Sequence, residues 1–269
     1  MIKNFEQDSV SYQQTQPFPY CYMDSALDEA TALAVQQEIL AIPPDQFDRY
    51  NNPFEQKYTL RDKHNLPPGL NDLFCFLESK SFVTKLSAFV GYSLFIDSTR
   101  NFHGVHLYEN RDSLDIHVDA GIHPTLRHKK QVTLGLYLSY QWQASYGCEL
   151  EIWQGDNAGV DKPCIYQCVD KIAPMFNRLV IFTNNDNSWH GNPIPAQCPS
   201  KARRIFITVS YLSHNNTFEN KRQKAYFVKR PQDPEDVDKD RLRLLRCDPE
   251  KYTVVYRSLD VNNNKRHTP

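Results

Sequence analysis

Apolar residues recur with a helical period in two segments of the first hundred residues. The first stripe consists of Ala26, Ala30, Leu33 and Leu40. Ser25 and Asp28 have the spacing of a capping box at its start, and the prolines at 43–44 predict its end. A second helix is predicted over about residues 70–90, and Gly91 stands where a C-terminal cap belongs. The chain therefore begins with a helical part.

The segments around these helices show no clear period. The first 20 residues are polar and rich in Gln, which indicates an arm lying on the surface. Residues 45–69 contain the turn clusters Asn51-Asn52-Pro53 and Pro67-Pro68-Gly69, so an irregular connection is expected there.

From about residue 103 the pattern changes to short strands. The predicted strands are 105–108, 114–118, 132–140, 149–153, 179–182 and 204–212. Such short strands, spaced by turn clusters, are typical of an antiparallel sandwich or barrel. The predicted fold class is mainly β with flanking helices, in which the N-terminal helices support the β region.

The chain changes character again after residue 214. This last part is rich in charge, with a predicted helix at 238–246, a strand at 253–256 and a disordered tail. We therefore expect three parts: an arm with helical support over 1–100, a β core over 101–214 and an extension over 215–269 that packs on the core.

Composition excludes several classes of protein. The 269 residues include 31 Lys and Arg against 32 Asp and Glu, so the net charge is −1, and binding to nucleic acid is not expected. No apolar run approaches the roughly 18 residues of a membrane span, and no apolar signal core begins the chain. The seven cysteines are irregularly spaced, so we expect reduced thiols and a cytoplasmic protein. The Cys164–Cys168 pair has no second pair to complete a zinc site.

Metal-ligating residue types come together at His117 and Asp119. On a strand, positions i and i+2 point to the same face, so both side chains can bind one metal ion. With nine histidines in the chain, such a pair alone is a weak signal. His190 follows a predicted buried strand and could supply the second imidazole of the two-His, one-carboxylate triad of non-haem Fe(II) oxygenases. A surface His beside a solvated Asp is the alternative interpretation.

The order of several segments between residues 108 and 212 resembles a known family. These segments are Leu107–Asp119, Val132–Ser139, Gly147–Trp153, Trp189–Pro193 and Arg203–Tyr211. Together they resemble the catalytic core of Fe(II)/2-oxoglutarate-dependent dioxygenases, most closely the prolyl-hydroxylase-like branch. The resemblance implies a double-stranded β-helix, or jelly roll, in agreement with the predicted strands. It does not extend to either flank.

The resemblance also implies roles for individual residues. His117, Asp119 and His190 match the iron ligands, which are the catalytic residues. Arg204 matches the cation that pairs with the distal carboxylate of 2-oxoglutarate, although Arg203 remains the alternative, because strand alternation lets only one of them face inward. In the same branch, matching tyrosines help to hold this carboxylate and line the pocket. They are Tyr137 and, more loosely, Tyr108.

The implied activity is oxidation of a substrate with Fe(II), 2-oxoglutarate and O2, which yields succinate and CO2, and ascorbate could serve as a reductant. Asp119 favours hydroxylation of an unactivated C–H bond, since the halogenases of this superfamily carry a small residue at that position. The substrate is a peptidyl proline or a small metabolite. The alternatives are a cupin-like module that binds metal or ligand without turnover, or a β-sandwich interaction protein. The oligomeric state is left open.

Four further features are given structural interpretations. His106 is expected to be a satisfied structural histidine, and the basic run at 127–130 a solvated loop. Arg241, Arg243 and Arg246 indicate an amphipathic surface helix. For Trp189 two interpretations stay open, namely that it shapes the pocket or that it packs in the core.

Overall fold

Antiparallel strands form the framework of the computed structural model, which describes residues 2, 9–214, 222 and 224–247. The strands are β1 (Tyr20–Met23), β2 (Phe47–Asn52), β3 (Glu55–Leu60), β4 (Phe95–Ile96), β5 (Gly104–Tyr108), β6 (Leu114–Val118), β7 (Lys129–Tyr137), β8 (Leu150–Gly155), β9 (Ile165–Ile172), β10 (Arg178–Thr183), β11 (Trp189–Asn192), β12 (Arg204–Ser213) and β13 (Tyr226–Phe227). The helices are α1 (Ser9–Gln14), α2 (Glu29–Ala41), α3 (Pro68–Glu78), α4 (Lys80–Val90) and α5 (Val237–Cys247), with 3-10 turns η1 (Pro44–Gln46) and η2 (Ala144–Tyr146).

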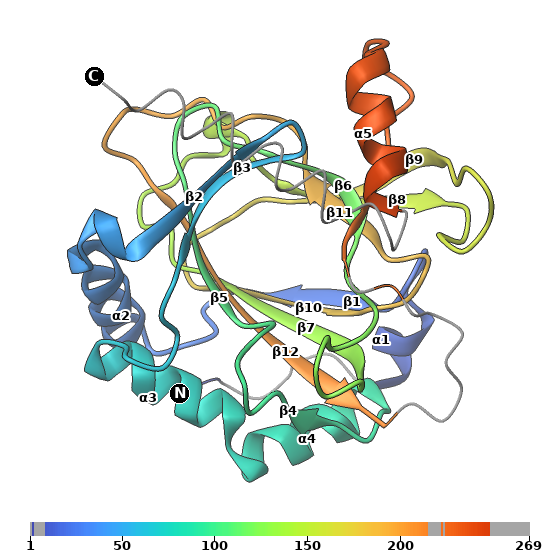
Figure 1. Cartoon of the computed structure of the whole chain (residues 1–269). Helices are drawn as coiled ribbons and strands as arrows, with labels where there is room; N and C mark the ends of the chain where they lie inside the picture. Colours follow the sequence, from blue (N-terminus) through green and yellow to red (C-terminus); the bar gives the residue numbers. More distant parts are fainter. Residues whose placement is uncertain (1, 3–8, 215–221, 223, 248–269) are drawn as a thin grey trace.

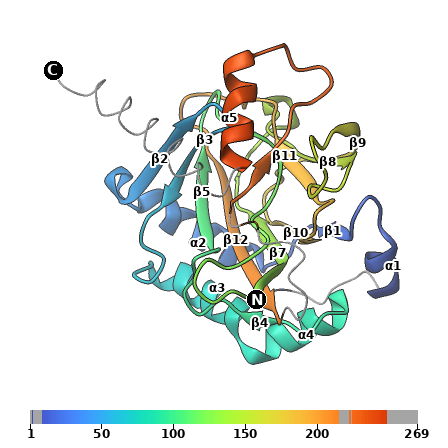
Figure 2. The same cartoon turned by 45° about the vertical axis from the view of Figure 1, so that its right-hand side comes forward.

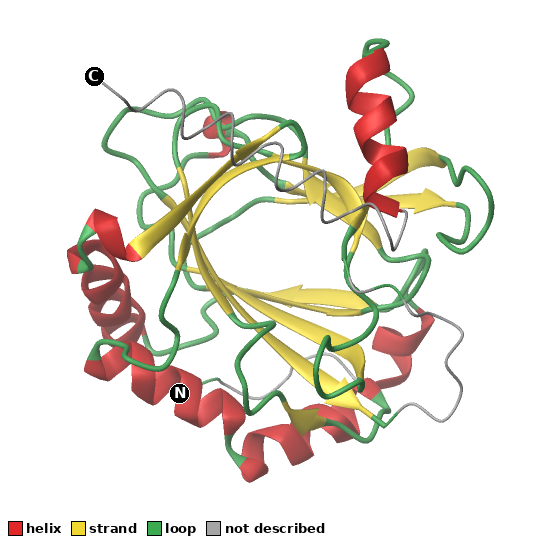
Figure 3. Ribbon diagram, viewed as in Figure 1, coloured by secondary structure: helices red, strands yellow, loops and turns green. Residues whose placement is uncertain are grey.

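The main path of the sheet runs β1-β10-β7-β12-β5-β3-β6-β11-β8-β9. Strands β2, β4 and β13 pair with β3, β12 and β6, respectively. The sheet curls round so that its two halves face each other across the interior (Figures 1 and 3). Strand β3 joins the halves, because it pairs with β5 through Tyr58 and Thr59 and with β6 through Glu55. The predicted class, a mainly β jelly roll with flanking helices, is confirmed.

Helices α2, α3 and α4 cover the outer face of one half of the sheet (Figures 1 and 3). Their buried side chains join outward-facing residues of the strands, such as Leu134 and Val209, in the largest apolar cluster. Alternation along a strand then turns the neighbours of these residues inward, toward the interior. The helices therefore support the sheet from outside and leave its inner face for polar side chains.

The start and buried face of α2 differ from the prediction. Asp28, not Ser25, is the N-cap, and its carboxylate accepts a hydrogen bond from Thr31 N at 3.2 Å. The helix ends before the prolines, as expected. Its buried residues are Ala32, Val35 and Ile39, whereas Ala30 and Leu40 are exposed.

The predicted helix over 70–90 is two helices, α3 and α4, separated at Ser79. Ser79 has extended backbone angles, and its hydroxyl caps α4 by accepting from Phe82 N at 3.2 Å. Gly91 ends α4 with φ +75°, the left-handed conformation that glycine adopts readily, as predicted.

The first 20 residues are not simply a surface arm. Tyr12 and Phe18 are buried, and the Tyr12 hydroxyl lies 3.0 Å from Thr183 Oγ1. Residues 20–23 form β1, which pairs with β10. The expectation of an arm lying on the surface was wrong for this segment.

Residues 45–69 are not irregular, because they contain the hairpin of β2 and β3. Figure 2 shows this hairpin beside β5 at the edge of the view, as part of the barrel wall. Three side chains of β3 reach the cavity: Glu55, Lys57 and Thr59. Because the inward positions of this strand are polar, its sequence lacks the alternation of apolar and polar residues that predicts a strand.

The remaining strand predictions agree with the structure to within a few residues, although β4, β9, β11 and β13 were missed. The predicted C-terminal helix is α5, whereas the predicted strand at 253–256 and the tail lie outside the described residues. The division into three parts stays a prediction, and strands from the first part belong to the same sheet as the core.

Within the described residues, no helix combines the length and apolar character needed to cross a membrane. The cysteines that the structure describes are free thiols: Cys21, Cys75, Cys148, Cys164, Cys168 and Cys198.

Candidate active site

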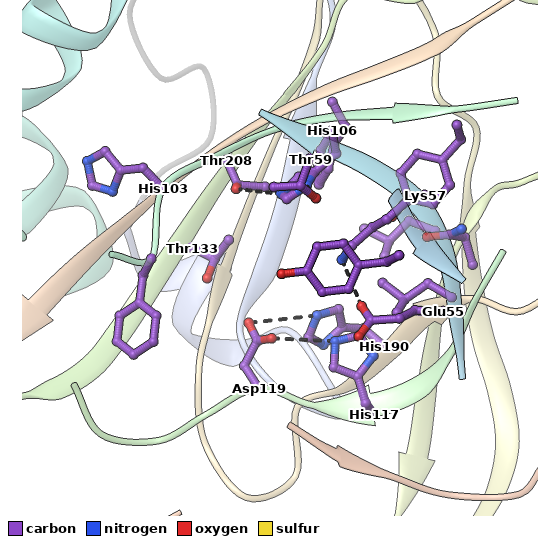
Figure 4. A pocket seen from close by; sticks show the side chains of 18 of the residues that line it. Glu55, Lys57, Thr59, His103, His106, His117, Asp119, Thr133, His190 and Thr208 are labelled. Atoms are coloured by element: carbon purple, nitrogen blue, oxygen red, sulfur yellow. Dashed lines mark hydrogen bonds and ion pairs between the residues drawn. The ribbon is translucent and has the colours of Figure 1, made fainter. Parts of the chain in front are cut away.

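His117, Asp119 and His190 converge inside the barrel (Figure 4). Antiparallel pairing of β6 with β11 sets His190 directly opposite His117, and their ring centroids are 4.6 Å apart. Asp119 follows β6, with Oδ1 3.4 Å from His117 Nε2 and Oδ2 4.0 Å from His190 Nε2. One ligand atom from each residue lies within 4.8 Å of the others, and no other such group of His, Cys, Asp or Glu exists in the described part of the chain. This geometry can hold one metal ion.

Backbone carbonyls fix the orientation of both imidazoles. His117 Nδ1 lies 2.9 Å from Asp115 O, and His190 Nδ1 lies 2.8 Å from Ser188 O. Because a carbonyl only accepts hydrogen bonds, each Nδ1 carries the proton, and each Nε2 keeps a lone pair that a metal ion can accept. Burial and the neighbouring His117 lower the pKa of His190 to about 4, so this imidazole is neutral at physiological pH. Both rings are thus held as metal-ligating tautomers.

Lys130 and Asn184 both donate to Oδ2 of Asp119. Lys130 Nζ donates to Asp119 Oδ2 at 2.6 Å. With its amide oriented to satisfy its neighbours, Asn184 donates to the same oxygen at 3.2 Å. Burial alone would raise the pKa of Asp119, but Lys130 and the two histidines hold it well below its usual value. The prediction of a solvated basic loop was therefore wrong for Lys130, which is buried on β7.

Arg204 and Arg203 point to opposite sides of β12, as alternation requires. Arg203 is partly exposed, and its guanidinium pairs with Glu109 at 2.8 Å. Arg204 is 1% exposed and lies 4.5 Å from the ring centroid of Tyr108 and 5.0 Å from that of Tyr137. Its Nη2 is 3.4 Å from the Tyr137 hydroxyl, whereas Nε and Nη1 have no hydrogen-bond partner among the described residues. A buried guanidinium without a carboxylate requires an anion, and the distal carboxylate of 2-oxoglutarate fits this need.

A cavity of about 760 Å³ connects the triad with Arg204. Sequence reasoning missed its wall from β3, where Lys57 Nζ pairs with the buried Glu55 at 3.1 Å. The C-terminal part of the chain also reaches this cavity through Lys224 and Arg246. Polar residues supply much of the remaining lining.

Other residues singled out in the sequence have clear places. His106 lines the cavity with both ring nitrogens near hydroxyls, 3.0 Å from Thr59 Oγ1 and 3.3 Å from Thr208 Oγ1, so it is satisfied as predicted. Trp189 is fully buried, donates to Asp156 O at 2.7 Å and packs in an apolar cluster away from the cavity lining.

Helix α5 was predicted to be an amphipathic surface helix, but two of its arginines face the barrel. Arg243 and Arg246 are largely buried and lie over the ring of Phe54 on the β2–β3 hairpin. Asp115 accepts ion pairs from Lys239 at 2.8 Å and Arg243 at 3.2 Å. The arginine side of the helix is therefore its contact with the barrel.

Comparison with protein families identifies the central part of the chain. Residues 103–212 match the sequence model of the 2OG-Fe(II) oxygenase superfamily, and this segment contains the triad and Arg204. These residues form a 2OG-Fe(II) oxygenase domain. Fe(II) and 2-oxoglutarate are accordingly its metal and cosubstrate, and the domain is that of a dioxygenase. No curated protein matches the chain.

Solved structures share the fold of this dioxygenase at low sequence identity. A prolyl hydroxylase from Trichoplax adhaerens, in complex with a hypoxia inducible factor peptide fragment, is 18% identical with a TM-score of 0.54, and the match covers 76% of this chain and 89% of that one. A Pseudomonas putida prolyl-4-hydroxylase is 13% identical with a TM-score of 0.55, covering 77% and 99%. HygX from Streptomyces hygroscopicus, with nickel, 2-oxoglutarate and hygromycin B bound, is 11% identical with a TM-score of 0.53, covering 86% and 98%. The jelly-roll fold of the dioxygenase thus extends beyond the segment matched by the family.

Proposed function

We propose that this dioxygenase hydroxylates an unactivated C–H bond of its substrate, with His117, Asp119 and His190 as the iron ligands. The observation that carries the proposal is the convergence of both Nε2 atoms on Asp119, with each Nδ1 held by a backbone carbonyl. Two imidazoles and one carboxylate on one face leave further coordination positions open. When bound, the metal and 2-oxoglutarate supply the oxidising chemistry that consumes O2 and releases succinate and CO2.

Arg204 and Tyr137 bind the distal carboxylate of 2-oxoglutarate in this proposal. Support comes from the partnerless Nε and Nη1 of Arg204 and from the Tyr137 hydroxyl beside Nη2. Tyr108 lines the same end of the cavity and lies under the guanidinium. These groups orient the cosubstrate, and the buried rings exclude water from it.

The substrate remains a peptidyl proline or a small metabolite. Two of the similar folds belong to prolyl hydroxylases, and the HygX structure contains hygromycin B. A cupin-like module without turnover is the second candidate, but such a module has no need of a buried arginine that lacks an anion. The free cysteines favour a reducing compartment such as the cytoplasm.

The test is an anaerobic absorbance titration of the metal-free protein with Fe(II) and then 2-oxoglutarate. A weak visible charge-transfer band that requires both additions, and that is lost in His190→Ala, is expected. Arg204→Met should weaken 2-oxoglutarate binding by about 10–100-fold, because a charge-assisted contact of about 1.5–3 kcal/mol is lost. Arg203→Met is the matched control, since its guanidinium pairs with Glu109 outside the cavity. Absence of the band in folded, metal-loaded wild type would refute the proposal.

A further inference from the structure

The cavity has a second end, opposite the one that Arg204 occupies. Arg204 pairs with Tyr108 across β12 and β5, whereas Thr208 pairs with Gly104 at the other end of the same strands. Four residues of strand correspond to about 13 Å. The loop at 101–103 precedes Gly104 and lines this second end.

Two lysines flank the loop at 101–103. Lys63 Nζ donates to the carbonyl oxygens of Asn101 at 3.2 Å and His103 at 3.1 Å. Lys130 Nζ lies 5.2 Å from the ring centroid of Phe102 while it binds Asp119. Both lysines line the cavity, and each contacts the loop at 101–103, so two ammonium groups border the cavity beside this loop.

Most other charges in the cavity wall are compensated by ion pairs. The pairs are Lys57 with Glu55 at 3.1 Å, Arg49 with Asp112 at 2.6 Å and Arg61 with Asp48 at 2.8 Å. Lys63 has no ion pair within the described part of the chain, and the partner of Lys130 is a proposed iron ligand. Fe(II) and the dianion 2-oxoglutarate cancel each other. Lys63, Lys130 and Arg204 then outnumber Asp119, and Lys224 and Arg246 are further cations in the cavity wall, so the filled site keeps an excess of positive charge.

Asp97 is the acid whose charge acts on Lys63, and it does not remove this excess of positive charge. Burial lowers the pKa of Lys63, and Asp97 opposes that shift only in part. Asp97 is itself buried, with its oxygens accepting from Thr99 and from Phe102 N and lying 3.2 Å from His123 Nε2. Desolvated cations without a nearby anion are unfavourable, so a bound anion at this end would be stabilised.

The potential of the cavity is positive at His106 as well. Burial is the main reason that the pKa of His106 lies well below its usual value, and four cations act in the same direction: Lys57, Lys63, Arg204 and Lys130. The imidazole is therefore neutral, and it stands with Thr59 and Thr208 as an uncharged polar wall next to the two lysines.

We propose that the substrate is a small anionic molecule whose carboxylate or phosphate group is bound by Lys63 and Lys130 at the end of the cavity opposite Arg204. This inference rests on the proposed function, since it assigns the Arg204 end to 2-oxoglutarate. It selects the small-metabolite class over a peptidyl proline, which is uncharged at the residue that would enter. The carbon to be oxidised then faces the triad, and the anionic group lies beyond Lys130.

Matched pairs of compounds test the charge requirement without knowledge of the natural substrate. The probes are N-acetylglycine with N-acetylglycinamide, and glycerol 3-phosphate with glycerol. Each is titrated calorimetrically into anaerobic wild-type protein loaded with Fe(II) and 2-oxoglutarate. At least one anion is expected to bind about tenfold or more tightly than its neutral partner, with weaker binding at higher ionic strength. The pair that responds identifies a carboxylate or a phosphate.

Variants of Lys63 locate the binding. Lys63→Gln should weaken binding of that anion by about tenfold or more, whereas Lys63→Arg keeps the charge and should retain most of it. Lys85→Gln, an exposed lysine on α4, is the control and should match wild type. If Lys63→Gln does not fold, the comparison of compounds on wild type still decides.

Three results would overturn the inference: equal binding of neutral and anionic partners, no binding of either anion, or unchanged binding in folded Lys63→Gln. Stimulation of succinate release by a capped, neutral proline peptide as strong as by the anions would overturn it too. The charge-transfer band is recorded before any probe is added. Absence of this band refutes the proposed function. A normal band together with any of the results above refutes only the proposal of an anionic substrate.

Discussion

Gly191→Ala should disturb the metal site from the strand behind it. A Cβ atom at residue 191 would lie 2.7 Å from Asp115 O and 2.8 Å from Leu114 O. Asp115 O is the carbonyl that lies 2.9 Å from His117 Nδ1 and orients that ring. Because both close atoms belong to the backbone of β6, no side chain can turn away to relieve the contact.

The expected magnitude follows from these distances. An ordinary contact needs at least 3.4 Å, so the Asp115 carbonyl and the new Cβ must separate by about 0.7 Å. Overpacking of this kind costs about 1–3 kcal/mol of unfolding free energy. Displacing the group that orients a ligating histidine typically costs about 10–100-fold in metal affinity. We expect both effects in Gly191→Ala.

Two measurements separate these effects: urea denaturation of the metal-free protein, and Fe(II) affinity from anaerobic titration. Gly159→Ala is the matched control, because its new Cβ would meet only the end of the Asn157 side chain, at 3.0 Å. A destabilised Gly191→Ala protein that binds Fe(II) as tightly as wild type would refute the role assigned to the Asp115 carbonyl. Unchanged stability together with unchanged affinity would refute the steric argument itself.

Two further predictions concern the supports of the site. Burial would raise the pKa of Glu78, but the neighbouring His103 imidazole and two hydrogen bonds from Arg100 lower it to about 2 from 4.5. This stabilisation is therefore present above about pH 4.5 and is lost as pH falls toward 2. Glu78→Gln should lower the free energy of unfolding by about 1–3 kcal/mol at pH 7, after allowance for solvent screening. The stabilities of variant and wild type, measured by urea denaturation, should converge in acid. A difference that stays the same at every pH would contradict this. Phe227 is buried against His117, with ring centroids 5.1 Å apart, so Phe227→Ala should cost about 3–5 kcal/mol in urea denaturation and weaken Fe(II) binding. An unaltered Fe(II) affinity would show that β13 plays no part in holding His117.

Part of the candidate site was recognisable from the sequence because its signal is local. His117 and Asp119 are two positions apart on one strand, and that spacing alone puts both on one face. Alternation allowed only one of Arg203 and Arg204 to face inward without deciding which, and in the structure Arg204 is the buried one. His190 came from order along the chain and from the family resemblance, because nothing local links it to His117. Only the pairing of β6 with β11 brings the two together.

The missed features share a physical cause, which is the polarity of the barrel interior. Periodicity detects a strand when its buried face is apolar, yet β3 buries Glu55, and its next inward residues are Lys57 and Thr59. Lys130 was assigned to a solvated loop for the same reason, since a lysine in a basic run is exposed unless a carboxylate such as Asp119 compensates it. The missed partners lie far away in sequence, so no local pattern could reveal them.

The polar interior also explains why so much of the chain outside the matched segment is needed around the cavity. Buried charges are costly unless paired, and several of the pairs that compensate them cross between distant parts of the sequence. Glu55 on the N-terminal hairpin lies between Lys57 and Arg246 of α5, with Arg246 Nη2 3.9 Å from its carboxylate. Asp115, whose carbonyl orients His117, is bound on its side chain by α5 as well. The hairpin and α5 thus neutralise charges on the same wall of the cavity. When the charges of the wall are paired in this way, they do not compete for a small charged substrate. The remaining lysines then determine which ligand binds.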